Sequence, residues 1–152
     1  MSQKLAGMVV SSTEVDLVIF ELDAGHFKLV SQAPLKAPVG DRAEAYRVVH
    51  EHLQDQLREA NVECACIKAS AVSLGGTKKA HLEAAELRGV ALAAAAAVCE
   101  VRSVSKATTS RTFGDRGVDE YLKDNTFWNG HGLADLKKGM REAAFTVISQ
   151  FA

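Results

Sequence analysis

The first third of the chain alternates between apolar runs and short polar breaks. Leu5 to Val10 and Val15 to Leu22 are rich in β-branched and aromatic residues, and the polar segment Ser11–Glu14 separates them. A third run, His26 to Ser31, follows the turn-forming residues Asp23, Ala24 and Gly25. Runs of this length with turn residues between them are typical of antiparallel strands joined in sequence. The pattern therefore predicts a three-stranded meander.

Helical and extended periods then alternate along the chain. Asp41 and Glu44 form a plausible capping pair, and apolar residues recur at three- and four-residue steps from Ala45 to Ala60, which predicts an amphipathic helix. Further helices are predicted from Lys78 to Val98 and from Leu133 to Phe151, with strands at Val62–Ala69 and Glu100–Val104. We expect Gly89 to let the alanine-rich second helix lie close against a neighbour.

The segment from Ser105 to His131 is polar, contains several glycines and has only weak periodicity. It predicts an irregular connection with one helical turn around Val118–Lys123. The complete order, βββαβαβα, predicts an α/β fold with a five-stranded mixed sheet, since a helical crossover favours parallel pairing. This is the ribonuclease-H-like order, with helices on both faces of the sheet and residues 1–152 in a single domain.

Composition limits the range of functions. The chain has 18 Lys and Arg against 19 Asp and Glu, a net charge of −1, so it is not basic enough overall for a general nucleic-acid binder. Its longest apolar runs are shorter than the roughly 20 residues that cross a bilayer, and no export signal opens the sequence. We expect a cytoplasmic protein with no membrane partner.

Three short motifs carry a family resemblance. The helix segment A-E-L-R-G-V-A at Ala85–Ala91 resembles an A-R-G-V-A stretch in RuvC-type Holliday junction resolvases. The strand Glu100–Val104 followed by Ser105–Thr108, and the closing segment Arg141–Ile148, resemble the family's next strand and its final helix. The chain is also similar to a group of small, uncharacterised bacterial RuvC-like proteins. The motifs are short, so they favour the fold more than the activity.

The resemblance implies that an active enzyme holds divalent metal ions with carboxylates from the first strand, the end of the fourth strand and the start of the last helix. The first-strand position falls at Ser11 or Ser12, and the fourth-strand position falls at Lys68 or Ala69. None of these residues is acidic, and a lysine repels a metal ion. This departure favours a degenerate nuclease centre.

The acids nearest to the family positions are Glu142, Asp135 and Glu14. Glu142 occupies the family position in the last helix, and Asp135, seven residues earlier, falls on nearly the same helix face, about 10 Å away along the axis. Glu14 lies in the turn after the first strand. Each is a candidate catalytic residue or a solvated acid, and we assign no metal ligand among them.

Cations and hydroxyls gather around the fifth strand and the loop that follows it. The cations are Arg102, Lys106, Arg111 and Arg116, and the hydroxyls belong to Ser103, Ser105, Thr108, Thr109, Ser110 and Thr112. Such donors suit the phosphate oxygens of nucleic acid. Phe113, Phe127 and Trp128 could stack on unpaired bases or cover the core. An ordinary polar connection is the alternative for this segment.

Three functions remain open at this stage. The favoured one is a RuvC-like protein with a degenerate nuclease centre that associates with nucleic acid or with a partner protein. The second is a divergent Mg²⁺-dependent endonuclease that uses Glu14, Asp135 and Glu142, with Mg²⁺ as the cofactor if the chain is active. The third is a homodimer that packs through the small residues around Gly89 and Ala93–Ala97 and has no nucleic-acid role.

Overall fold

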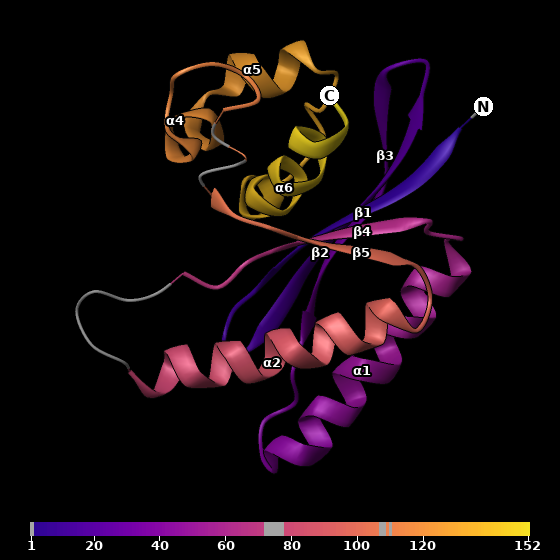
Figure 1. The fold of residues 1–152 in the computed structure, drawn as a ribbon, viewed down its shortest axis with the longest axis vertical. Coiled ribbons are helices and arrows are strands. Elements are labelled where there is room, and N and C mark those ends of the chain that lie inside the picture. The colour runs from indigo at the N-terminus through magenta and orange to yellow at the C-terminus, as the bar shows by residue number, and fades with distance from the viewer. Residues whose placement is uncertain (1, 72–77, 107–108, 110) are drawn as a thin grey trace.

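A five-stranded mixed sheet forms the centre of the computed structural model, which describes residues 2–71, 78–106, 109 and 111–152 (Figure 1). The strands are β1 (Gln3–Val10), β2 (Glu14–Asp23), β3 (His26–Lys36), β4 (Cys64–Lys68) and β5 (Glu100–Val104). They lie in the order β3-β2-β1-β4-β5, with the first three antiparallel and with β4 parallel to both β1 and β5. The predicted meander and both parallel crossovers are confirmed.

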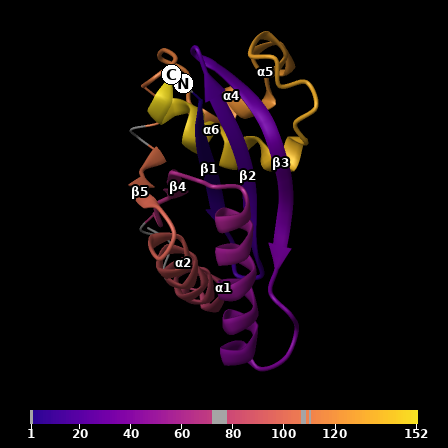
Figure 2. The same cartoon turned by 90° about the vertical axis from the view of Figure 1, so that its right-hand side faces the viewer.

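Helices cover both faces of the sheet (Figures 1 and 2). The helices α1 (Arg42–Glu59) and α2 (Lys79–Ala96) lie on one face, and α4 (Val118–Lys123), α5 (Asn125–Gly130) and α6 (Arg141–Phe151) lie on the other. Two apolar clusters fill the two interfaces. Ile19 and Leu53 belong to the cluster on the α1 side, while Phe20 and Phe145 belong to the one on the α6 side. Neighbours along β2 alternate between the two cores, as the pleat requires.

The start of α1 agrees with its predicted cap. The side chain of Asp41 accepts a hydrogen bond of 3.1 Å from the backbone N–H of Glu44, which satisfies one of the free donors at the helix N-terminus. The stripe that buries α1 consists of Ala45, Val49, Leu53 and Leu57. These residues come from the predicted apolar positions, so the helix packs on the sheet as expected.

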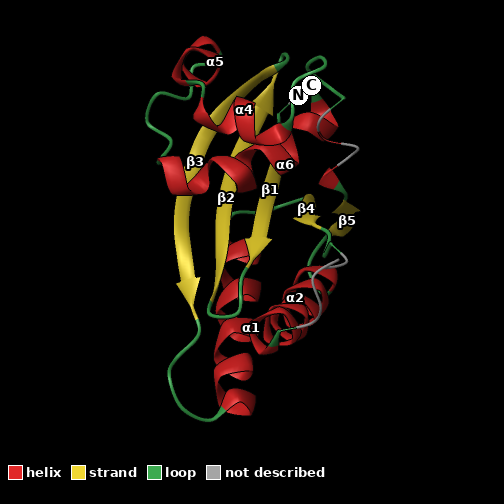
Figure 3. Ribbon diagram, turned by 90° about the vertical axis from the view of Figure 1, so that its left-hand side faces the viewer, coloured by secondary structure: helices red, strands yellow, loops and turns green. Residues whose placement is uncertain are grey.

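The predicted last helix is too long. The chain forms a short 3₁₀ helix, η1 (Lys138–Met140), and α6 begins only at Arg141 (Figure 3). Leu133 and Leu136 are buried, which explains the apolar pattern, but the backbone between them and η1 is held against β3 instead of coiling. Gln32 on β3 donates to the carbonyl of Asp135 at 3.0 Å and accepts from the N–H of Lys137 at 2.8 Å. Asp135 and Glu142 therefore do not share a helix face.

Two glycines behave differently from expectation. Gly89 is exposed, and a Cβ atom at this position would meet nothing within 4 Å, so the predicted close approach at Gly89 is wrong. The close approach occurs at Gly7 on β1, where a Cβ atom would lie 2.1 Å from the carbonyl oxygen of Ala143. Gly7 thus lets α6 lie almost directly on β1, which brings the first turn of that helix to the sheet.

The connection from β5 to α6 contains the predicted helical turn, α4, and also α5, which the sequence did not predict. Trp128 is fully buried on the α6 side, and its indole N–H donates to the carbonyl of Tyr121 at 2.9 Å. Phe113 and Phe127 pack edge to face beside it, with ring centroids 5.2 Å apart. These aromatic residues cover the core, and Trp128 is not available to stack on bases.

Candidate functional site

The central strands place three side chains at one level of the sheet. Val9 on β1 is paired with Asp16 on β2, and Met8 is paired with Ile67 on β4, so Lys68 stands level with Val9 on its other side. Gly7, two residues before Val9, touches α6, and side chains two apart on a strand point to the same face. Asp16, Val9 and Lys68 therefore lie on the α6 side of the sheet.

The helix α6 adds an acid to this level. Glu142, in its first turn, accepts a hydrogen bond from the Lys68 ammonium, with 2.9 Å between Nζ and Oε2. The two side chains are 32% and 30% exposed, so the pair is partly shielded from water. The cation that the sequence places at the end of the fourth strand thus binds an acid in the first turn of the last helix.

Asp16 is the acid that sequence reasoning missed. Its Oδ1 atom is buried and has no hydrogen-bond partner within the described part of the chain. Burial, a hydrogen bond with Glu14 and the negative charges of Glu14 and Glu142 together raise the pKa of Asp16 to about 7. The signal was present in the sequence, because Asp16 is the one charged residue in the otherwise apolar run Val15–Phe20.

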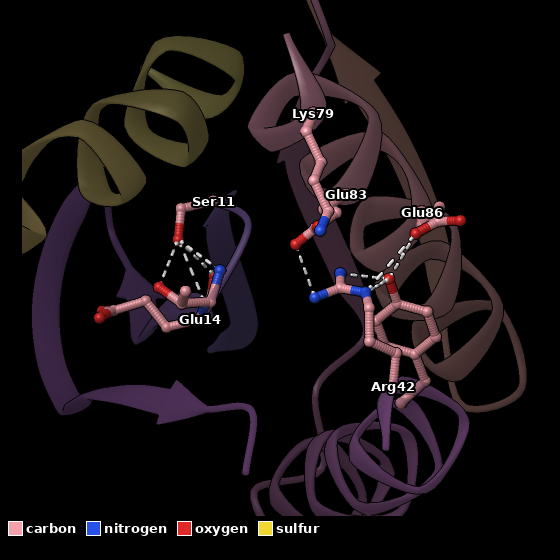
Figure 4. A network of polar contacts seen from close by, with 8 residues as sticks. Ser11, Glu14, Arg42, Lys79, Glu83 and Glu86 are labelled. Carbon is pink, nitrogen blue, oxygen red and sulfur yellow. Dashed lines mark hydrogen bonds and ion pairs between the residues drawn. The ribbon is translucent and has the colours of Figure 1, made fainter. Parts of the chain in front are cut away.

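Glu14 begins β2, next to the tight turn that leads into it. The hydroxyl of Ser11 accepts from the backbone N–H groups of Thr13 and Glu14, at 3.3 and 3.2 Å (Figure 4). Ser11 therefore shapes the turn, and both Ser11 and Ser12 lie beyond the end of β1. The β1 residue that lies level with Lys68 is Val9, and not Ser11 or Ser12.

The three predicted acids are thus only partly brought together. Glu14 and Glu142 both act on Asp16, whereas Asp135 lies in the segment that Gln32 holds against β3. Among the residues that the structure describes, no three His, Cys, Asp or Glu side chains are placed to hold a metal ion. The site consists of a carboxylate group around Asp16 and a lysine that binds one of its members.

Most of the predicted phosphate-binding cations already have acidic partners. Lys106 lies 3.5 Å from Asp119, Arg116 lies 3.1 Å from Asp124, and Arg102 lies 3.2 Å from Glu100. The guanidinium groups of Arg116 and Arg102 also lie over the rings of Tyr121 and Phe151. Arg111 is exposed, with no ion-pair partner among the described residues. Arg111 is therefore the member of this group that is free to bind phosphate.

The hydroxyls of the same segment have mixed positions. The Thr109 hydroxyl donates to the carbonyl of Lys106 at 2.8 Å, and the Thr112 hydroxyl donates to the carbonyl of Ser149 at 3.0 Å. Both are used within the fold. The predictions for Thr108 and Ser110, and the resemblance at Ala107, fall outside the described residues. Lys106 also lines a small cleft together with Lys68 and Glu142, which links this segment to the site.

The sheet order, the antiparallel meander, the two parallel crossovers and the helix lying over β1 define an α/β domain with a RuvC-like, ribonuclease-H-like fold. Two solved structures of Thermus thermophilus RuvC share it. One superposes with a TM-score of 0.76, and the other, a complex with a Holliday junction substrate, with a TM-score of 0.73. Both are 14% identical to this chain and cover 97% of it, and the chain covers 92% and 91% of theirs.

The likeness at this identity concerns the fold. No protein-family model matches the chain, and no curated protein matches it. No helix in the described part of the chain is long and apolar enough to cross a membrane.

Proposed function

We propose that this chain is a single-domain, RuvC-like protein with a degenerate nuclease centre, which binds branched nucleic acid without cutting it. The observation that carries the proposal is the ion pair between Lys68 and Glu142, 2.9 Å long, at the level where the β1, β4 and α6 positions meet. A lysine at that place occupies an oxygen that a metal ion needs, and Val9 supplies no oxygen at all.

The residues present do not fit a Mg²⁺ ion. Mg²⁺ requires oxygen ligands in near-octahedral geometry and loses its water reluctantly. Here one carboxylate is bound by an ammonium group, and the β1 residue at the same level, Val9, has no side-chain oxygen. Phosphodiester hydrolysis through bound metal ions is therefore not part of the proposed function.

The nucleic-acid part of the proposal is supported by the fold and by the surface around β5. A RuvC of the same fold was solved with a Holliday junction substrate. In this chain the exposed Arg111 and the partly paired Lys106 follow β5, and Lys106 borders the cleft beside Glu142. Contacts of this kind to phosphate give affinity that depends on salt and not on base sequence.

The test is binding of a fluorescent four-way DNA junction, and of a duplex of the same sequence, measured by anisotropy at low salt in EDTA, Mg²⁺ or Mn²⁺. We expect junction binding in all three buffers and no cleavage products on a denaturing gel. The combined Lys106→Ala and Arg111→Ala variant should bind at least about tenfold more weakly, since two phosphate contacts are lost. Lys28→Ala with Lys36→Ala, on the exposed edge strand β3, is the matched control. Absence of binding at low salt would overturn the proposal.

A divergent endonuclease is a second candidate, favoured by the buried, unpartnered oxygen of Asp16 between two other acids. A bound cation would offset the repulsion among these three acids and would give the Asp16 oxygen a partner. Asp16 would then be the third acid of the set in place of Asp135. This function requires Lys68 to release Glu142. It predicts Mg²⁺- or Mn²⁺-dependent cleavage of the junction that Asp16→Asn and Glu142→Gln each abolish, and such a result would replace the first proposal.

Self-association is a further candidate, supported by α2. Leu82 is 58% exposed, and the small residues Ala85, Gly89 and Ala93 are exposed along the same side of the helix, beside the charged Glu86. An apolar helix face that remains uncovered is typical of an interaction surface. Sedimentation velocity should show a dimer that Ala93→Glu converts into a monomer, and a wild-type chain that stays monomeric at high concentration would contradict this role.

A further inference from the structure

A second cleft lies at the carboxyl ends of β1 and β4, on the side where α2 begins. It has a volume of about 370 Å³ and is lined by Val9 and Val10 of β1, Lys68 to Ala71 at and after the end of β4, and His81, Ala84 and Arg88 of α2. This volume is within the range of small-ligand sites. The chain leaves β1 and β4 toward opposite edges of the sheet, and ligands in open α/β sheets bind at such switch points.

Arg88 is the unusual residue of this cleft. Within the described part of the chain, its buried Nε atom has no hydrogen-bond partner, and no carboxylate pairs with its guanidinium group. A buried donor without an acceptor destabilises the fold, and a buried charged donor does so more strongly. An anion in the cleft would compensate the positive charge of this guanidinium group.

The acidic residues of α2 are turned away from the cleft. Glu83 and Glu86 both face α1, where Arg42 binds Glu83 at 2.8 Å and the Tyr46 hydroxyl donates to Glu86 at 2.7 Å (Figure 4). His81, Ala84 and Arg88 follow at steps of three and four residues, so they share a different helix face. The described lining of the cleft therefore contains no carboxylate, and its charged residues are cationic.

We infer that this cleft binds a phosphate group, with Arg88 as the main ligand and with His81 and Ser70 as further donors, while the Lys68 ammonium stays bound to Glu142. The planar guanidinium fork matches phosphate oxygens and gives two parallel hydrogen bonds. The phosphate could belong to a small phosphorylated molecule or to a nucleic-acid strand, and both present the same chemistry. The site goes beyond the proposed function, because it requires no branched nucleic acid and no bound metal.

The experiment follows the arginine Nε–Hε resonances of the ¹⁵N-labelled, full-length chain during titration. The probes are inorganic phosphate, a 5′-phosphorylated tetranucleotide and the same tetranucleotide with a 5′-hydroxyl. The Arg88 resonance is assigned as the one that Arg88→Lys removes, and we expect phosphate to shift it. Arg88→Gln should weaken binding by about tenfold or more, because a charge-assisted hydrogen bond is lost. Arg58→Gln, exposed in the last turn of α1, should leave it unchanged.

The relative binding of the three probes identifies the source of the phosphate. Preference for the 5′-phosphorylated tetranucleotide identifies a strand end, equal binding of the two tetranucleotides identifies backbone phosphates, and binding of inorganic phosphate alone identifies a small molecule. The inference is overturned if no probe moves the Arg88 resonance at up to about 10 mM, or if Arg88→Gln binds as tightly as the wild type while keeping its thermal midpoint. A chain that binds phosphate but no junction would sink the proposed function and leave this site standing.

Discussion

Asp16 lies in surroundings that disfavour its charge. Its carboxyl group is partly removed from water, one oxygen has no donor among the residues that the structure describes, and Glu14 and Glu142 add negative charge nearby. Lys68, the cation at the same level of the sheet, is bound to Glu142. Because no donor compensates for the buried oxygen, the folded chain holds this carboxyl more readily in its protonated form.

The first prediction concerns Asp16→Asn. The pKa of Asp16 is about 7 in the folded chain against 3.8 for an ordinary aspartate, so its stabilising contribution is complete below about pH 4 and is lost as the pH rises through 7. The variant should therefore gain stability relative to the wild type between pH 5 and pH 8, on the order of 1–2 kcal/mol after the screening of a partly exposed group is allowed for. Urea unfolding at both pH values measures it.

Asp55→Asn, an exposed position on α1, is the control for Asp16→Asn and should show no such pH dependence. A variant that is less stable than the wild type at pH 8 would contradict the prediction. Repeating the pH 8 measurement with Mg²⁺ also distinguishes a degenerate centre from a divergent endonuclease. Mg²⁺ should stabilise the wild type only if Asp16 binds the metal ion.

The second prediction concerns the pair of Lys68 and Glu142. Side chains that are about one-third exposed and 2.9 Å apart should show a coupling energy of about 1 kcal/mol, near the upper end for surface ion pairs. A double-mutant cycle with Lys68→Met and Glu142→Gln measures it, and salt should reduce it. The more exposed pair of Arg47 and Glu51 provides the comparison, with a smaller coupling. Equal stability of all four proteins would show that the pair does not hold α6 to β4.

At the scale of elements, the position of α6 depends on a residue that has no side chain. The backbone of Ala143 lies so close to Gly7 that any larger residue would collide with a carbonyl group, which cannot rotate away as a side chain can. This contact places the first turn of α6, and therefore Glu142, above the central strands. The site is built by close backbone packing as much as by its charged groups.

The third prediction compares Gly7→Ala with Gly89→Ala. A Cβ atom at Gly7 would lie 2.1 Å from the Ala143 oxygen, so α6 must move, and we expect a loss of about 3 kcal/mol or more of unfolding free energy. At Gly89, inside α2 and exposed, a Cβ atom meets nothing within 4 Å, and the substitution should stabilise the chain by about 0.5–1 kcal/mol. Denaturant unfolding measures the unfolding free energy of both variants. Equal changes at Gly7 and Gly89 would contradict the prediction.

Elements with a strong local signal were predicted correctly. The first two strands, the Asp41 cap and the stripe of α1 follow from residue spacing alone, whereas β3 continues past its predicted end at Ser31 to Lys36. The last helix was extended too far because Leu133, Leu136 and Met140 keep a helical spacing while the tertiary bonds of Gln32 fix a different backbone. The neighbours of Lys68 could not be predicted for a similar reason. Strand register, which no local pattern gives, decides that Val9 and Asp16 lie at its level.

At the scale of the whole molecule, positive and negative charges nearly cancel, and around β5 most cations pair with acids close to them. The chain has a net charge of −1, and three of the four cations around β5 are bound to nearby acids. Long-range attraction for nucleic acid is therefore weak, and any binding must come from a few cations that can reach phosphates without losing an existing partner. Arg111 meets this condition best in the described part of that segment.

The fourth prediction follows from this difference between Arg111 and Arg116. The logarithm of junction affinity should fall linearly with the logarithm of salt concentration, and Arg111→Ala should reduce that slope by about one because one phosphate contact is lost. Arg116→Ala should leave the slope unchanged, because Asp124 and the Tyr121 ring already hold that guanidinium group. Anisotropy titrations over a range of NaCl concentrations measure both slopes. A larger change for Arg116 than for Arg111 would mean that the existing ion pairs open on binding, and the surface would then have to be assigned to the whole group of cations around β5.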